Sequence, residues 1–303
     1  MRYINCAIVS LIFQLSVFVS FPTGAYAQSA CGSVNGEITT LGDSGEVAGL
    51  GWCLITPERM QITVHFIGLC TTAPTWQNFD TVCDEVFSSN SGTLATIERG
   101  APLPLADEIS IPEGNYTHAA IFIGNQIKHA SLIKFNSNRI GQQGTGTWCW
   151  STSNGNASVG IADGVRAGYI ADCGDNPPAS SEVGYNVSTA TSVADDTPPD
   201  FRGDYTTGTT ASTTWEVYVL DENRGRDANP ATPDVENAAY FIGIQRFNTP
   251  VIITANTSSV DLGFRLTNTF GLNVDENTVD GSGNKSHVKG FVLGGFEFRV
   301  VPN

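Results

Sequence analysis

Basic residues are scarce in this chain of 303 residues, which contains 15 Lys and Arg against 30 Asp and Glu and carries a formal net charge of -15. Phosphate backbones are bound by clustered Lys and Arg, so we expect no nucleic-acid partner. An acidic surface favours solubility in a salty medium, and it also offers oxygen ligands to cations.

Recognisable catalytic signatures are absent as well. The sequence has no G-x-S-x-G elbow, no H-E-x-x-H pair and no glycine-rich phosphate loop between a strand and a helix. The acids that a glycoside hydrolase would require, such as Asp84 and Asp107, fall in predicted turns, where acids are common. We therefore expect a non-catalytic protein without a cofactor, with a glycoside hydrolase as a lower-ranked alternative.

Long apolar runs are missing after residue 27, so the mature chain has no stretch of the ~20 residues that a membrane-spanning helix needs. Residues 1–27 have the features of a secretory signal, with Arg2 at the start, an apolar run from Ile8 to Phe21, and Ala25-Tyr26-Ala27 as the cleavage motif. We expect export to the extracellular space, the cell surface or the periplasm.

Cysteine usage supports an oxidising compartment, because one cysteine lies in the predicted signal and the other six lie between Cys31 and Cys173. No C-x-x-C spacing indicates zinc. Six cysteines allow fifteen pairings. The spacing favours three disulfides: Cys70 with Cys83, Cys149 with Cys173, and Cys31 with Cys53.

Apolar residues follow the period of strands. From Arg59 to Leu69 they alternate with polar residues, which predicts a half-buried strand. Tyr116 to Ile123 and Ile127 to Phe135 are separated by Gly124-Asn125, which predicts a hairpin. Further strands are expected at Thr147 to Thr152, Thr214 to Leu220, Ala238 to Phe247, Val251 to Asn256, Val260 to Thr267 and Phe291 to Val301.

No window of ten or more residues combines helical periodicity with caps. The fold class predicted is therefore all-β, with antiparallel sheets stacked as an immunoglobulin-like or jelly-roll-like β-sandwich. The chain forms either one large sandwich or two consecutive ones.

Composition suggests a division of the mature chain. Residues 28–178 carry all six mature cysteines, residues 179–213 form a Ser-, Thr-, Asp- and Pro-rich linker or long loop, and residues 214–303 form a cysteine-free β domain. Residues 119–126 resemble residues 238–245, which indicates either an internal duplication or the limited vocabulary of buried strands.

One loop resembles a calcium site in its spacing, since Asp221, Asn223 and Asp227 alternate with other residues around Gly225. It lacks the glutamate and the glycine position of an EF-hand, so a plain connecting loop is the competing interpretation. Calcium is the one metal that the sequence suggests.

These features together predict a secreted structural or adhesive protein that is a possible assembly subunit and has a surface glycan or protein as its partner. The alternative is a calcium-assisted, lectin-like module. Such a module needs accessible aromatic rings, for which Trp76, Trp215 and Tyr218 are the candidates.

Overall fold

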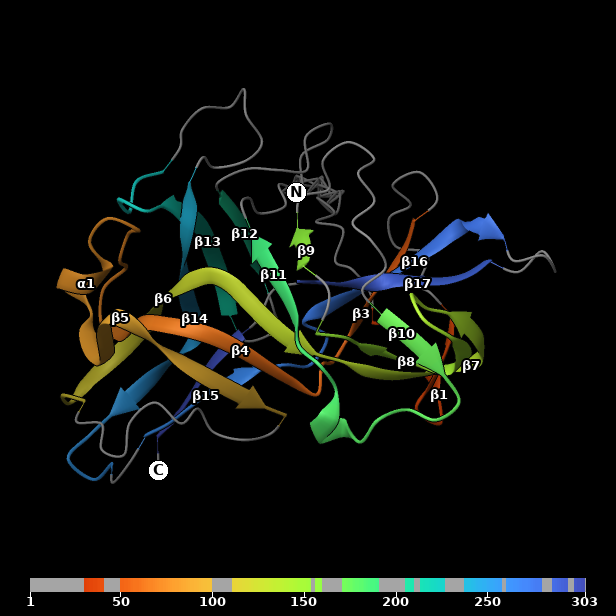
Figure 1. The fold of residues 1–303 in the computed structure, drawn as a ribbon. Coiled ribbons are helices and arrows are strands. Elements are labelled where there is room, and N and C mark those ends of the chain that lie inside the picture. The colour runs from red at the N-terminus through yellow and green to blue at the C-terminus, as the bar shows by residue number, and fades with distance from the viewer. Residues whose placement is uncertain are drawn as a thin grey trace, which may run out of the picture.

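Nearly all of the described chain is β-structure, arranged in several sheets that are mainly antiparallel (Figure 1). The only helical elements described are α1 (Phe79–Val82) and a 3-10 turn at Ser180–Glu182. Within the described residues, no helix has the length and apolar character to cross a bilayer. The all-β prediction is confirmed.

The structure, a computed structural model, describes residues 30–40, 50–99, 111–153, 156–159, 171–190, 205–209, 213–226, 237–257, 260–279, 285–293 and 297–302. The predicted signal, residues 1–27, lies outside them.

Period-two alternation produces the strand predicted at Arg59, which is β4 (Arg59–Cys70). Met60, Ile62 and Val64 are fully buried on one face, whereas the intervening side chains are only half-buried. Beyond Val64 both faces of the strand become buried, because α1 and its loop cover the second face. This change in burial marks the part of the central sheet that α1 covers.

The central sheet is built around two long strands, β6 and β14, that pair with each other. Its strands run in the order β5–β4–β6–β14–β13–β12, and β11 and β9 extend it beside the carboxyl end of β6. Its strands are β4, β5 (Asp84–Glu98), β6 (Gly114–Ala130), β9 (Asn156–Val159), β11 (Asn186–Ala190), β12 (Tyr205–Thr209), β13 (Thr213–Asp221) and β14 (Ala238–Ile253).

A second sheet lies beside the central one and has the order β1–β2–β7–β17–β16–β3, with β8 and β10 attached to β7. A two-stranded ribbon, β15 (Val260–Arg265) with β18 (Glu297–Pro302), completes the fold. The second sheet contains β1 (Gly32–Val34), β2 (Glu37–Thr40), β3 (Leu50–Ile55), β7 (Leu132–Ile140), β8 (Thr145–Ser151), β10 (Ala171–Gly174), β16 (Phe270–Val279) and β17 (Lys285–Leu293).

The predicted hairpin at Gly124-Asn125 is wrong, because β6 runs straight through these residues. Opposite them β4 changes register, so that Ile62 faces Ile127 while Val64 faces Ile123. The amide of Asn125 donates a hydrogen bond of 2.7 Å to the carbonyl of Ala238 on β14. The residues that resemble a turn therefore form a bulge in a strand that has partners on both edges.

Two other strand predictions differ from the structure in their continuity. The strands expected at Ala238 to Phe247 and Val251 to Asn256 are one strand, β14, with a bulge between Arg246 and Val251. The single strand expected at Phe291 to Val301 is the end of β17 and, separately, β18.

The described strands cross the predicted domain boundary. β11 and β12 lie inside residues 179–213, so these parts of the predicted linker are strands instead. Asn186 and Ser188 of β11 are buried although they are polar, which explains why composition alone suggested a loop. β6 precedes the predicted boundary and β14 follows it, and the two strands pair in one sheet. The choice between one large unit and two consecutive ones stays a prediction.

The two similar segments of the sequence are neighbours in this sheet. Phe122 stands opposite Ile242, and Ile123 stands opposite Phe241, so the matching residues pair about a local two-fold point. The flanking strands break this symmetry: β4 lies next to β6 but two strands before it, whereas β13 directly precedes β14. A common position at the sheet centre accounts for the resemblance without a duplication.

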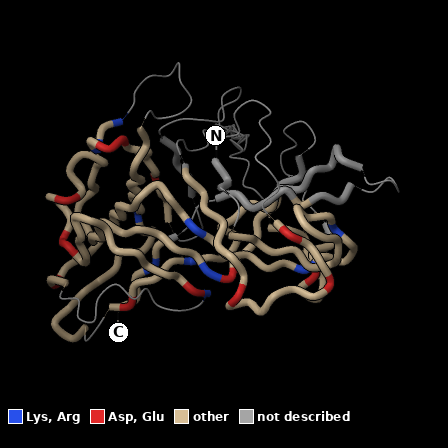
Figure 2. The backbone as a smooth tube through the Cα atoms, in the orientation of Figure 1, with Lys and Arg blue, Asp and Glu red and all other residues tan. Residues whose placement is uncertain are grey.

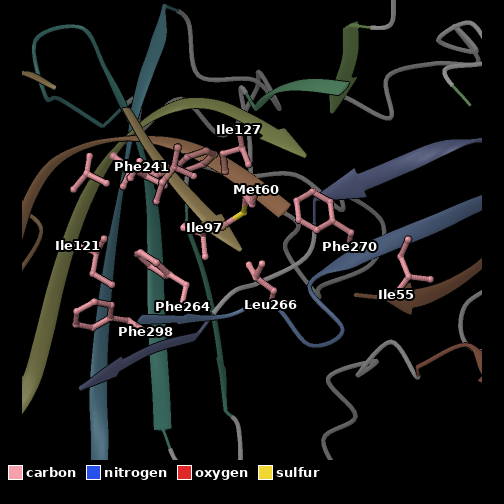
Figure 3. Packing of buried hydrophobic residues seen from close by; sticks show 14 of the residues in the cluster. Ile55, Met60, Ile97, Ile121, Ile127, Phe241, Phe264, Leu266, Phe270 and Phe298 are labelled. Atoms are coloured by element: carbon pink, nitrogen blue, oxygen red, sulfur yellow. The ribbon is translucent and has the colours of Figure 1, made fainter. Parts of the chain in front are cut away.

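Two apolar clusters lie on opposite faces of the central sheet. The larger one fills the space toward the ribbon and the second sheet, and Figure 3 shows Phe264 and Phe298 of the ribbon reaching toward Ile121 and Phe241. The smaller one lies on the other face, beneath α1, and contains Phe66, Phe79 and Phe122 among its buried members. The larger cluster carries most of the apolar burial that stabilises the fold.

The three predicted disulfides are present. Cys31 is joined to Cys53, Cys70 to Cys83, and Cys149 to Cys173. The third links directly opposed residues of β8 and β10. The second closes the loop that carries α1, and this loop shapes the candidate site.

Candidate functional site

The face of the central sheet under α1 carries a cluster of aromatic side chains. Alternate residues of β6, β13 and β14 point to this face, among them Phe122, Tyr218 and Tyr240. Phe122 is buried, whereas Tyr218 and Tyr240 keep part of their surface exposed. Trp76 joins them from the loop before α1. We call Trp76, Phe122, Tyr218 and Tyr240 the aromatic face.

The loop that presents Trp76 is held at both ends. The Cys70–Cys83 disulfide closes it, and the side chain of Asn78 accepts a hydrogen bond of 2.7 Å from the backbone N–H of Thr75. Phe79 anchors α1 to the sheet, with its ring centroid 5.5 Å from that of Phe122. The ring of Trp76 is thereby placed with its centroid 6.5 Å from that of Tyr218.

A second loop, Asp221 to Arg226, also borders the aromatic face. Arg224 has a φ of 61°, a left-handed conformation that reverses the chain there. Its guanidinium carbon lies 4.8 Å from the ring centroid of Phe122, and its Nη1 lies 3.6 Å from Oδ2 of Asp80 in α1. The guanidinium carbon of Arg226 lies 5.1 Å from the centroid of Tyr218. Arg224 and Arg226 therefore lie against the rings of Phe122 and Tyr218 and form cation–π contacts with them.

The predicted calcium loop shares these residues, but its carboxylate serves the turn itself. Oδ1 of Asp221 accepts hydrogen bonds from the backbone N–H groups of Asn223 at 2.8 Å and of Gly225 at 2.7 Å. Asp227 lies outside the described residues. Across the part of the chain that is described, no three His, Cys, Asp or Glu side chains are grouped to hold a metal ion. Calcium binding stays a prediction.

The same face of the central sheet carries a hollow of about 370 Å³ nearer the start of β6, which we call the His118 hollow. The bulge of β14 between Arg246 and Val251 forms one wall of it. Its lining residues come from three segments: Ala73, Thr117, His118, Arg246, Phe247, Asn248 and Pro250. The hydroxyl of Tyr218 donates a hydrogen bond of 2.8 Å to Oε2 of Glu216. The charge of Glu216 also acts on His118, which lines the hollow.

His118 is the polar centre of the hollow. Burial lowers the pKa of His118, and the nearby charge of Arg246 lowers it further, while Glu216 acts in the opposite direction. Oγ1 of Thr117 lies 2.8 Å from Nδ1 of His118. The same hydroxyl of Thr117 donates a hydrogen bond of 3.2 Å to the carbonyl of Thr71. Since the hydroxyl has one proton, donation to Thr71 leaves it the acceptor toward the ring. The geometry thus supplies hydrogen-bonding groups for a ligand.

His65 also belongs to this face, although the alternation of β4 predicts a polar, solvent-facing position. The register of β4 against β5 shifts between Val64 and Phe66. The ring of His65 also forms hydrogen bonds with the backbone of Ser89 and Asn90 in β5, whose carbonyls accept. Its ring centroid lies 5.2 Å from that of Tyr240. Burial is the main reason why the pKa of His65 is lowered.

Of the three aromatic residues nominated from the sequence, the structure brings two together. Trp76 and Tyr218 are ring neighbours, whereas Trp215 points to the opposite face of the sheet with Val217 and Val219. Tyr240 and the two arginines were missed, because their positions depend on the pairing of distant strands. Comparisons with protein-family models, with curated proteins and with solved structures find no match to this chain.

Proposed function

We propose that this chain is a secreted, non-catalytic adhesive protein of the cell surface or an extracellular assembly, and that it binds a glycan through the aromatic face and the His118 hollow. One observation carries the proposal: the partly exposed rings of Trp76 and Tyr218 are neighbours on the same face of the central sheet as a hollow lined by polar groups. Sugars present apolar C–H faces and hydroxyl edges, so rings flanked by hydrogen-bonding groups suit both parts.

Export is supported by the signal-like residues 1–27 and by the three disulfides, which persist in oxidising compartments. In this proposal the central sheet and the elements opposite it stack across the larger core as a β-sandwich. The proposal does not use calcium: Oδ1 of Asp221 accepts two hydrogen bonds within its own turn, and the described residues contain no group of three His, Cys, Asp or Glu that could hold a metal ion.

A glycan array tests the proposal with a control that the sheet itself provides. Trp76→Ala and Tyr218→Ala remove rings from the aromatic face, whereas Trp215→Ala removes a ring from the opposite face of the same sheet. We expect wild-type protein to bind a class of oligosaccharide, and each of the first two variants to weaken binding by about tenfold or more, since a stacked ring contributes on the order of 1.4 kcal/mol.

The control should bind as the wild type does once its folding has been verified by circular dichroism. Adding a chelator should leave binding unchanged, whereas a loss on chelation would favour the calcium-assisted alternative. Equal losses in all three variants, or no glycan binding by the wild type, would contradict the proposal.

A further inference from the structure

The ribbon has an outer face with a second hollow of about 370 Å³, on the opposite side of the central sheet from the aromatic face. The position of the ribbon follows from β14: Gln245 bonds to the backbone of Phe298, while Arg246, the next residue, faces the His118 hollow. We call this second depression the arginine hollow. Its lining contains three arginines and one acid among Arg99, Asp261, Leu262, Gly263, Phe264, Arg265, Leu266, Thr267, Arg299 and Val301.

Strand alternation builds this hollow. Leu262 and Phe264 of β15 and Phe298 of β18 point into the larger core, so their neighbours Arg265 and Arg299 point outward and are exposed. Gly263 stands opposite Arg299 in the ribbon, and a Cβ built on Gly263 would meet no atom within 4 Å. The absent side chain of Gly263 leaves open space on the ribbon opposite the backbone of Arg299.

Arg99 enters from the end of β5 in a fixed orientation. Its Nη2 donates to the carbonyls of Thr56 at 3.1 Å and Pro57 at 3.3 Å, and it pairs with Oε1 of Glu58 at 3.2 Å. These bonds limit the rotamers of a long side chain before any ligand arrives, which lowers the entropic cost of binding.

The lining of the arginine hollow has a net charge opposite in sign to that of the chain, although Glu58 offsets the charge of Arg99. Figure 2 marks the basic and acidic residues along the described backbone. The protein has twice as many acidic as basic residues, yet three of its 15 basic residues line this one depression and Asp261 is the one acid among its lining residues. Arginine presents a planar fork of donors that matches a carboxylate or sulfate group. A positive depression on an acidic protein concentrates anions where the rest of the surface repels them.

We propose that the arginine hollow binds the carboxylate or sulfate groups of an acidic extracellular polysaccharide. This site is separate from the aromatic face, so the protein would hold two ligands on opposite surfaces. The inference does not depend on glycan binding at the aromatic face, because the two sites share no residue.

Titration with polygalacturonate, a uronate polymer, at about 50 mM salt tests the proposal, because exposed charges are weakly screened there. Arg299→Ala should weaken binding by about tenfold, and Arg299→Lys should restore only part of it, because lysine keeps the charge and loses the fork. Lys128→Ala is the matched control, since it removes one partly exposed cation from the central sheet, outside both hollows. The control should stay within about twofold of the wild type.

Three outcomes overturn the proposal: no binding of polygalacturonate or dextran sulfate by the wild type, an equal loss in Lys128→Ala, or an affinity for sodium sulfate equal to that for the polymer. The last would assign the hollow to a free anion. The Arg299 variants should retain the wild-type response on the neutral-glycan array, so failure of one proposal is distinguishable from failure of the other.

Discussion

The hydroxyl oxygen of Tyr116 lies 2.9 Å from Oδ2 of Asp84 and 2.8 Å from the carbonyl oxygen of Pro112. Tyr116 is completely buried, and burial together with the adjacent carboxylate of Asp84 raises the pKa of its hydroxyl, which therefore stays protonated and donates. The contact ties the first residues of β6 to the first residue of β5 and fixes the chain that enters β6.

Tyr116→Phe removes this donor and leaves the acceptors without it. We expect the free energy of unfolding to fall by about 1–3 kcal/mol, because the half-buried carboxylate of Asp84 loses a charge-assisted hydrogen bond. Urea denaturation at neutral pH measures the change. Tyr185→Phe is the control, since the ring of Tyr185 contacts the guanidinium of Arg59 and phenylalanine preserves this contact. If both variants lose the same stability, the hydroxyl of Tyr116 has no special structural role.

The Cys70–Cys83 disulfide connects stability to the aromatic face. Replacing both cysteines by serine should lower the free energy of unfolding by about 3 kcal/mol, as expected for a crosslink across 13 residues, and should also weaken glycan binding because Trp76 loses its anchored loop. The Cys149–Cys173 pair spans 24 residues in the second sheet. Its double serine variant should lose similar stability but keep the glycan affinity of the folded protein. Loss of affinity in both double variants would show that the effect is general.

His129 makes stability dependent on pH. Complete burial lowers the pKa of His129 from its ordinary value of 6.5 to about 3. Between these values the unfolded chain binds a proton that the folded chain does not, so stability is retained above the higher value and falls as the pH decreases. The contribution from this residue amounts to about 2 kcal/mol between about pH 7 and about pH 5.

Unfolding of the wild type and of His129→Gln across this range isolates that contribution. The free energy of unfolding of the variant should fall less steeply as the pH decreases, and the difference in slope should correspond to about one proton. The other histidines titrate in both proteins, so their contribution cancels. The lowered pKa values of His65 and His118 act in the same direction, so the variant should keep a residual slope. Parallel profiles for the two proteins would mean that the pKa of His129 is not lowered in the native state.

The pairing of β6 with β14 predicts that the two parts of the chain stay together after cleavage. A protease site engineered within residues 191–204 should yield two fragments that elute as one complex without denaturant, because their shared strands bury apolar residues on both faces. Gel electrophoresis under denaturing conditions confirms the cut. Separation of the fragments in native buffer would support the two-domain interpretation.

Local patterns predicted much of this fold. The alternation from Arg59 and the run at Thr214 to Leu220 correspond to β4 and β13, because a half-buried strand imposes its period on adjacent residues. The disulfide pairs also followed from spacing, since two of them close short loops or join neighbouring strands.

Features that depend on distant strands were not predictable in the same way. Gly124-Asn125 has the composition of a turn, but β14 and β4 hold both edges of the strand at that point. The polar β11 is recognisable as a strand only when β6 is known to lie beside it. Local composition carries no information about such partners.

The candidate site also contains residues that local patterns predict and residues that depend on distant strands. Trp215 and Tyr218 are three residues apart on one strand, so period-two alternation already places them on opposite faces. Tyr240 reaches the aromatic face through the pairing of β14 with β13, and Arg224 reaches it through the turn at Asp221. These contacts require the three-dimensional arrangement.

The central claim, that the aromatic face receives the glycan, is tested most directly by hydrogen exchange of the native protein with and without an oligosaccharide selected from the array. Bound ligand should slow exchange in residues 71–78, 116–118 and 216–224, which border the rings and the His118 hollow, and should leave the ribbon unchanged. Protection confined to the ribbon or the second sheet, with none in these segments, would contradict the account.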